Sequence, residues 1–69
     1  MPPLFPDKPS AADMRAVIAY YRIVKTDLAR DLGIDPASLY RRLIGKTKWR
    51  DLEIAKVREI VEAMRGDGA

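Results

Sequence analysis

The chain has 69 residues, of which 48% are hydrophobic and 33% charged, with a formal net charge of +3 and neither cysteine nor histidine. This length fits one small globular domain, and the missing residue types exclude a disulfide, a Cys/His zinc site and the usual nucleophile–base pairs of hydrolases. We therefore expect no enzyme and no cofactor. No apolar run is long enough for a membrane span and no signal peptide is apparent, so we expect a cytoplasmic protein.

Proline dominates the start of the chain. Four of the five prolines fall in residues 1–9, which predicts an extended arm in place of a helix or a central strand. A helical domain is expected over residues 10–66. Ser10 and Asp13 have the spacing of a capping box, so the first helix should begin at Ser10. Its apolar stripe is formed by Met14, Val17, Ile18 and Tyr21.

Two short helices are expected next. The first should end at Gly33, a residue suited to a left-handed helix terminus, and its inner face carries Leu28, Ala29 and Leu32. Asp35 and Pro36 are suited to the N-cap and first position of the following helix. That helix should run to about Ile44 and end at Gly45.

The last helix should begin near Asp51, after a basic loop that contains the only tryptophan, Trp49. We expect Trp49 to fill the core between the last two helices, although stacking on a sugar is the alternative. The last helix should cover the core with Ile54, Val57, Val61 and Met64. Gly66 begins a frayed end, and residues 67–69 are expected to form the tail. The predicted fold class is all-α, a compact four-helix domain.

The stretch from Lys25 to Gly45 carries the functional signal. A connection of three residues, Gly33-Ile34-Asp35, joins two short helices, and the small Ala29 suits their close crossing. This arrangement predicts a helix-turn-helix, against the weaker alternative of an ordinary helical hairpin.

Residues Met14–Met64 resemble the phage-repressor and Cro-like helix-turn-helix domains, in the variant common in actinobacteria and their phages. The resemblance rests on Leu39-Tyr40-Arg41-Arg42-Leu43-x-Gly45-Lys46, followed by an aromatic and an acidic residue, Trp49 and Glu53. It implies that the helix from Pro36 to Ile44 enters the DNA major groove and that the preceding helix abuts the DNA backbone. It also implies a bacterial cell or a phage-infected host.

The positive charge is concentrated in one window. Residues 1–35 contain five acids and five bases, and residues 51–69 contain five acids and three bases. Residues 36–50 contain five bases and no acid, which is a charge of +5. Such a focused charge suits a polyanion, although a solvated basic face without a ligand has the same composition.

A helical wheel predicts which side chains read bases. With Leu39 and Leu43 facing inward, Arg41 points about 180° away, where its guanidinium suits the O6/N7 edge of guanine. Tyr40 and Arg42 flank the buried edge at about 80° on either side, so the direction of Arg42 is open. The candidate base-reading residues are Ala37, Ser38, Tyr40, Arg41 and Arg42.

Phosphate contacts are expected on either side of this helix. Lys25 and Thr26 open the preceding helix, whose terminal N–H groups also favour an anion. The loop after the helix from Pro36 to Ile44, the recognition helix of this interpretation, supplies Lys46, Lys48 and Arg50.

These features predict a sequence-specific, double-stranded DNA-binding transcriptional regulator, a Cro-like or minimal phage-type repressor, with no small-molecule ligand. A homodimer that forms mainly on DNA is expected, joined through Leu52, Ile60, Leu4 and Phe5, unless these residues complete the core of a monomer. The alternatives are an excisionase-like architectural factor that bends DNA and a helical interaction or antitoxin-like module without a DNA role. Membrane-surface binding is disfavoured because Leu39 and Leu43 are assigned to the core.

Overall fold

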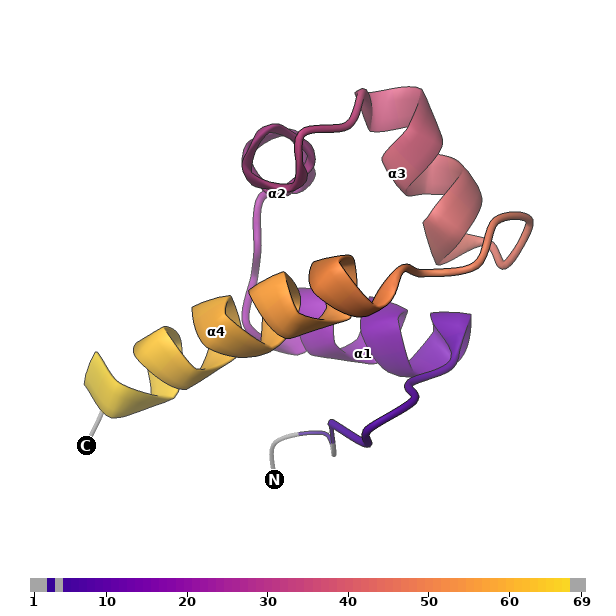
Figure 1. Cartoon of the computed structure of the whole chain (residues 1–69). Helices are drawn as coiled ribbons and strands as arrows, with labels where there is room; N and C mark the ends of the chain where they lie inside the picture. The colour runs from indigo at the N-terminus through magenta and orange to yellow at the C-terminus, as the bar shows by residue number, and fades with distance from the viewer. Residues whose placement is uncertain (1–2, 4, 68–69) are drawn as a thin grey trace.

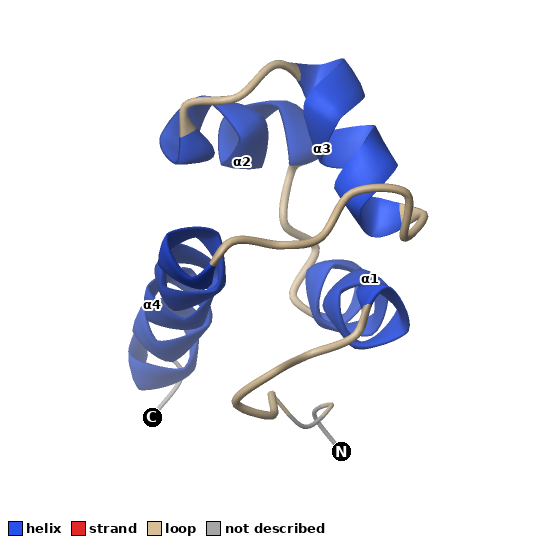
Figure 2. Ribbon diagram, turned by 45° about the vertical axis from the view of Figure 1, so that its right-hand side comes forward, coloured by secondary structure: helices blue, strands red, loops and turns tan. Residues whose placement is uncertain are grey.

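The computed structural model describes residue 3 and residues 5–67. Within this part of the chain there are four α-helices and no strand (Figures 1 and 2), which confirms the all-α prediction. The helices are α1 (Ala11–Tyr20), α2 (Lys25–Leu32), α3 (Pro36–Leu43) and α4 (Asp51–Asp67). In both views α1 and α4 form one layer, and α2 and α3 lie over it.

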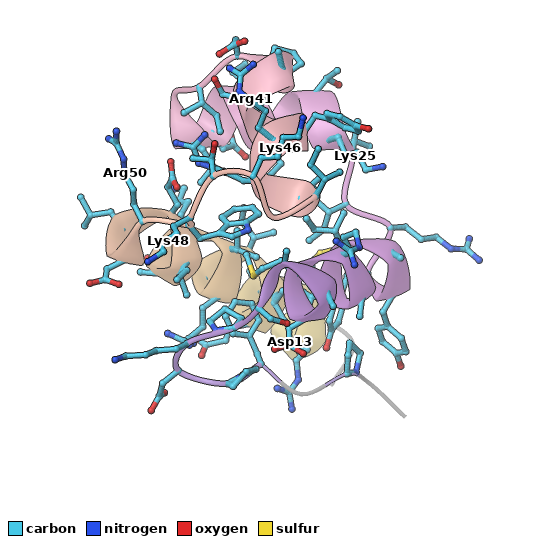
Figure 3. All side chains as sticks on the ribbon, turned by 90° about the vertical axis from the view of Figure 1, so that its right-hand side faces the viewer. Asp13, Lys25, Arg41, Lys46, Lys48 and Arg50 are labelled. Atoms are coloured by element: carbon cyan, nitrogen blue, oxygen red, sulfur yellow. The ribbon has the colours of Figure 1, made fainter. Side chains whose placement is uncertain are left out.

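The start of α1 is closed by its own side chains. The Ser10 N–H donates to Asp13 Oδ2 at 2.9 Å, and the Asp13 N–H donates to Ser10 Oγ at 3.1 Å, which is the predicted capping box. Figure 3 shows Asp13 on α1, well below α3. The stripe that follows is buried at Met14, Val17 and Ile18, as the sequence predicted.

The helix-turn-helix pair is formed by α2 and α3. Gly33 ends α2 with φ of +72°, the left-handed conformation that glycine adopts at no steric cost. Ile34 and Asp35 complete the connection, and Pro36 is the first residue of α3. In Figure 1 α2 is seen end-on while α3 is seen from the side, so the two helices cross steeply.

All four helices contribute to one core. Its fully buried side chains include Met14, Val17, Leu28, Leu39 and Val57. Trp49 is half-buried and packs against this cluster, as the core interpretation predicted, and its indole N–H is buried without a hydrogen-bond partner.

The last helix differs from the prediction at its C-terminal end. Ile54, Val57 and Val61 are buried, but Met64 is 40% exposed, because the layer formed by α2 and α3 lies over the N-terminal part of α4 and leaves its end uncovered. Gly66 does not take a left-handed conformation, so the helix continues through it to Asp67. Of the predicted tail, residues 68–69 lie outside the described part.

Part of the N-terminal arm contacts α4. The Arg58 guanidinium carbon lies 4.7 Å from the centre of the Phe5 ring, and Arg58 Nη2 donates to the Pro6 carbonyl at 3.1 Å. Phe5 also packs against the core. Phe5 therefore helps to complete the core of its own chain, which was the alternative to a dimer contact. Leu4, the other residue of the arm considered for that contact, lies outside the described residues.

Candidate nucleic-acid interface

The outer face of α3 is exposed along its length. Leu39 and Leu43 are 1% and 5% exposed and fix the inner face of the helix, as the wheel predicted. Arg41 and Ala37 are exposed on the opposite side, and Tyr40 is 62% exposed. Three of the five predicted base-reading residues therefore present their side chains to solvent.

A chain of hydrogen bonds runs along this outer face. The Ser38 hydroxyl donates to Asp35 Oδ1, and Arg41 Nη2 donates to Ser38 Oγ at 3.2 Å. Asp35 stands at the N-cap position, as predicted, but its side chain bonds Ser38 and makes no capping bond to the backbone. The hydrogen bond from the Ser38 hydroxyl is the largest cause that lowers the pKa of Asp35, and the nearby backbone N–H groups of Asp35 and Ser38 and the charge of Arg41 lower it further. Ser38 is half-buried, and its hydrogen bond to Arg41 Nη2 favours one position of the Arg41 side chain.

Arg42 points the other way, and this corrects its inclusion among the base-reading candidates. Its Nε donates to Glu53 Oε1 at 2.9 Å, and its Nη1 donates to the Ser38 carbonyl at 3.1 Å. The side chains of Arg42 and Glu53 are only 8% and 7% exposed. Burial of a guanidinium without an anion would be costly, so the pairing with Glu53 explains why Arg42 faces inward.

Glu53 is a site residue to which the sequence analysis gave no structural role. Besides pairing with Arg42, its Oε1 accepts a hydrogen bond of 2.9 Å from the Arg50 N–H. One carboxylate thus joins the inner side of α3, the end of the basic loop and the start of α4. Arg50 and Glu53 have the three-residue spacing of a capping box. This spacing was the feature of the sequence that could have indicated a structural role for Glu53.

Five of the predicted contact residues carry exposed basic side chains. Figure 3 looks onto this face of the molecule, with α3 and its following loop toward the viewer. The side chains form a broad group around α3 and the loop, and the labelled members are Lys25, Arg41, Lys46, Lys48 and Arg50. Thr26 is also exposed, beside Lys25 at the start of α2.

The N-terminus of α2 has no side-chain cap, unlike the N-terminus of α1. Val24 occupies the N-cap position, and no side-chain hydrogen bond caps the helix there. The first-turn N–H groups therefore lack a side-chain acceptor, which is the condition in which a helix terminus binds an anion. Lys25 stands at the first position of this helix and adds positive charge to it.

The structure also brings other bases near this surface. Arg15, Arg22 and Lys25 line a groove of about 500 Å³ together with Tyr40 of α3. A second hollow, of about 360 Å³, is lined by Lys8 of the arm and Lys48 of the loop. The sequence analysis missed Lys8, Arg15 and Arg22, because only the tertiary fold brings these distant residues together.

Comparisons of the chain with protein-family models, with curated proteins and with solved structures found no match. In the described part of the chain, no helix is long and apolar enough to cross a bilayer. The function of this surface is accordingly inferred from its geometry and charge.

Proposed function

We propose that this chain is a sequence-specific, double-stranded DNA-binding transcriptional regulator whose helix α3 enters the major groove. The proposal keeps the Cro-like or phage-repressor resemblance of the sequence. In it Arg41, Ala37 and Tyr40 face base edges, and Lys25, Lys46, Lys48 and Arg50 bind phosphates on either side.

The observation that carries this proposal is that the basic side chains on the outer side of α3 and in the following loop are not neutralised, whereas the one on the inner side is. The window of residues 36–50 contains five bases. Arg42 is paired internally with Glu53, whereas Arg41, Lys46, Lys48 and Arg50 are exposed and form no ion pair with another described residue. Four unneutralised cations around a protruding helix suit a duplex, whose phosphates flank the groove that admits a helix.

Base reading is assigned chiefly to Arg41. Its side chain leaves α3 opposite the buried leucines, and the hydrogen bond from its Nη2 to Ser38 restricts its position. An arginine held in this way loses less conformational freedom when it pairs with guanine. Ala37, one turn earlier on the same side, suits contact with a thymine methyl group.

Pairing on a two-fold operator is part of the proposal, since one recognition helix covers only a few base pairs. Half-sites would lie about 34–36 Å apart. Of the residues considered for the dimer contact, Phe5 and Ile60 pack against the core of their own chain, whereas Leu52 is 85% exposed. The proposed contact therefore centres on Leu52.

Site selection from a random duplex library tests this function, followed by affinity measurements at several salt concentrations. We expect an enriched motif and a linear fall of log K with log salt, with a slope of about 0.9 per phosphate contact. Four phosphate-binding residues correspond to a slope of about 3.6. No enriched motif together with a slope near zero would contradict the proposal, and an unsymmetrical motif bound by one chain would contradict the dimer alone.

A further inference from the structure

The groove between α1, the start of α2 and the end of α3 is apolar at its floor. Its walls include Ile18, Ile23 and Leu43, and two exposed apolar side chains, Val24 and Ile44, stand at its edge with exposures of 56% and 41%. A hollow with an apolar lining and a few polar groups around it is the usual form of a binding site.

Three bases and no acid line the same groove. Arg15, Arg22 and Lys25 are exposed, and none of them forms an ion pair with another described residue. Arg15 also donates a hydrogen bond to the Leu43 carbonyl at the end of α3, which holds its positive charge beside the groove. The groove therefore combines an apolar floor with a positive rim.

We infer that this groove is a docking site for an acidic, amphipathic segment of a partner protein. The floor accepts bulky aliphatic side chains, as grooves that bind amphipathic helices do, and the rim attracts carboxylates between them. DNA fits this combination less well, because a sugar-phosphate backbone has no aliphatic side chain to fill a volume of about 500 Å³.

The position of the groove gives docking a consequence for DNA binding. Lys25 and Tyr40 line it and also belong to the proposed DNA interface. A partner in the groove would compete with the duplex for these two residues. The competition with DNA rests on the proposed function, whereas the binding of a partner in the groove does not depend on it.

The test uses the full chain, labelled with ¹⁵N, in solution without DNA. The probe is a synthetic helical peptide with leucines at i, i+3, i+4 and i+7 and glutamates at most other positions. One control peptide has lysine in place of glutamate, and another has serine in place of leucine. We expect saturable changes in the amide shifts of Val24, Tyr40 and Ile44 with the first peptide alone.

Val24→Asp provides the matched variant. Aspartate is a good N-cap, so this substitution should stabilise α2 while it places a negative charge at the groove edge. We expect peptide affinity to fall at least about fivefold through like-charge repulsion, with a raised thermal midpoint. Val24→Thr supplies a cap without a charge and should retain the affinity.

A second variant removes a rim charge without straining the backbone. Arg22 has φ of +53°, a conformation that asparagine tolerates better than most residues. Arg22→Asn should weaken binding about two- to fivefold, the effect of one exposed ion pair, and Arg65→Gln on α4 should not.

Three results would overturn the inference: no saturable shift, equal binding of the lysine peptide, or unchanged affinity in Val24→Asp. A duplex that shifts Ile23 and Ile44 in place of the peptide would assign the groove to DNA. Because the peptide is measured without DNA, failure of the proposed function leaves this result intact.

Discussion

Arg41 and Arg42 are consecutive residues of α3, yet Arg41 is exposed on its outer face and Arg42 is buried at its inner face. The Arg41 side chain donates a hydrogen bond to Ser38 of its own helix, whereas the Arg42 side chain is paired with Glu53 of α4. The same residue type thus serves two purposes one position apart. The window of five bases presents only four charges outward, because Glu53 neutralises the fifth.

This difference also separates what holds the domain together from what is available to a ligand. The inner network joins α3, the loop and α4 through Glu53, so its loss should affect folding. The outer network of Asp35, Ser38 and Arg41 is local to one helix, so its loss should affect recognition. Four single substitutions and one double variant test this division, and the single substitutions follow in order of decreasing effect.

Glu53→Ala should have the largest effect. It leaves the Arg42 guanidinium buried without an anion, a change that costs about 3–5 kcal/mol in the free energy of unfolding. Urea denaturation measures this cost. Glu59→Ala, at an exposed position of the same helix, is the control and should change stability by less than about 0.5 kcal/mol.

The double variant Arg42→Met with Glu53→Leu sharpens this prediction. Replacing a buried ion pair by apolar side chains is often neutral or stabilising, so most of the lost stability should return. A double variant as unstable as Glu53→Ala would show that the hydrogen bond from Arg50 to Glu53, and not the buried charge, dominates.

Arg41→Ala should change specificity and leave folding intact. We expect a loss of about 1–3 kcal/mol of discrimination at one base pair per half-site, with the free energy of unfolding altered by less than about 0.5 kcal/mol. Site selection with both proteins measures the first quantity, and Arg41→Lys keeps the charge without the bidentate fork. Recovery of an unchanged motif by Arg41→Ala would remove Arg41 from the base-reading residues and leave Tyr40 as the next candidate.

Lys48→Ala should weaken binding to all duplexes about equally. One lost phosphate contact lowers the slope of log K against log salt by about 0.9 and leaves the selected motif unchanged. The same variant of an exposed lysine on α4, Lys56→Ala, is the matched control and should leave the slope as it was. A changed motif would place Lys48 at a base edge.

Ser38→Ala should have the smallest effect, on the titration of Asp35. The Ser38 hydroxyl lowers the pKa of Asp35 below its ordinary value of 3.8, so removing it should raise that pKa, as a carboxyl-detected NMR titration would show. A lowered pKa stabilises the fold above the unfolded-state value and loses this contribution as pH falls through the folded-state value. Wild type and variant should therefore differ above about pH 4 and converge below it. An unchanged pKa would exclude the Ser38 hydroxyl as its cause.

Local signals predicted much of the fold. The capping box of Ser10 and Asp13, the glycine at position 33 and the pair Asp35-Pro36 each act within one or two turns, so the sequence alone defines them. The inward direction of α3 followed in the same way from Leu39 and Leu43. These local rules are what place Arg41 on the outer face.

Long-range contacts were beyond the same reasoning. The wheel set Tyr40 and Arg42 at equal angles from the buried edge, and only Glu53, eleven residues further along, decides between them. The groove brings together Arg15, Arg22 and Tyr40 from separate elements. Phe5 meets Arg58 across most of the chain, and no local pattern indicates that pairing.

The exposure of the outer face of α3 bears on how such a protein changes over generations. Within the described residues the Arg41 side chain hydrogen-bonds only Ser38 of its own helix, and Ala37 is exposed. Mutations at these two positions meet few packing constraints, so a lineage can acquire a new target site without a compensating change in the core. Mutations at Arg42 have no such freedom, because Glu53 would have to change with it. Two adjacent codons are thus expected to evolve under opposite constraints.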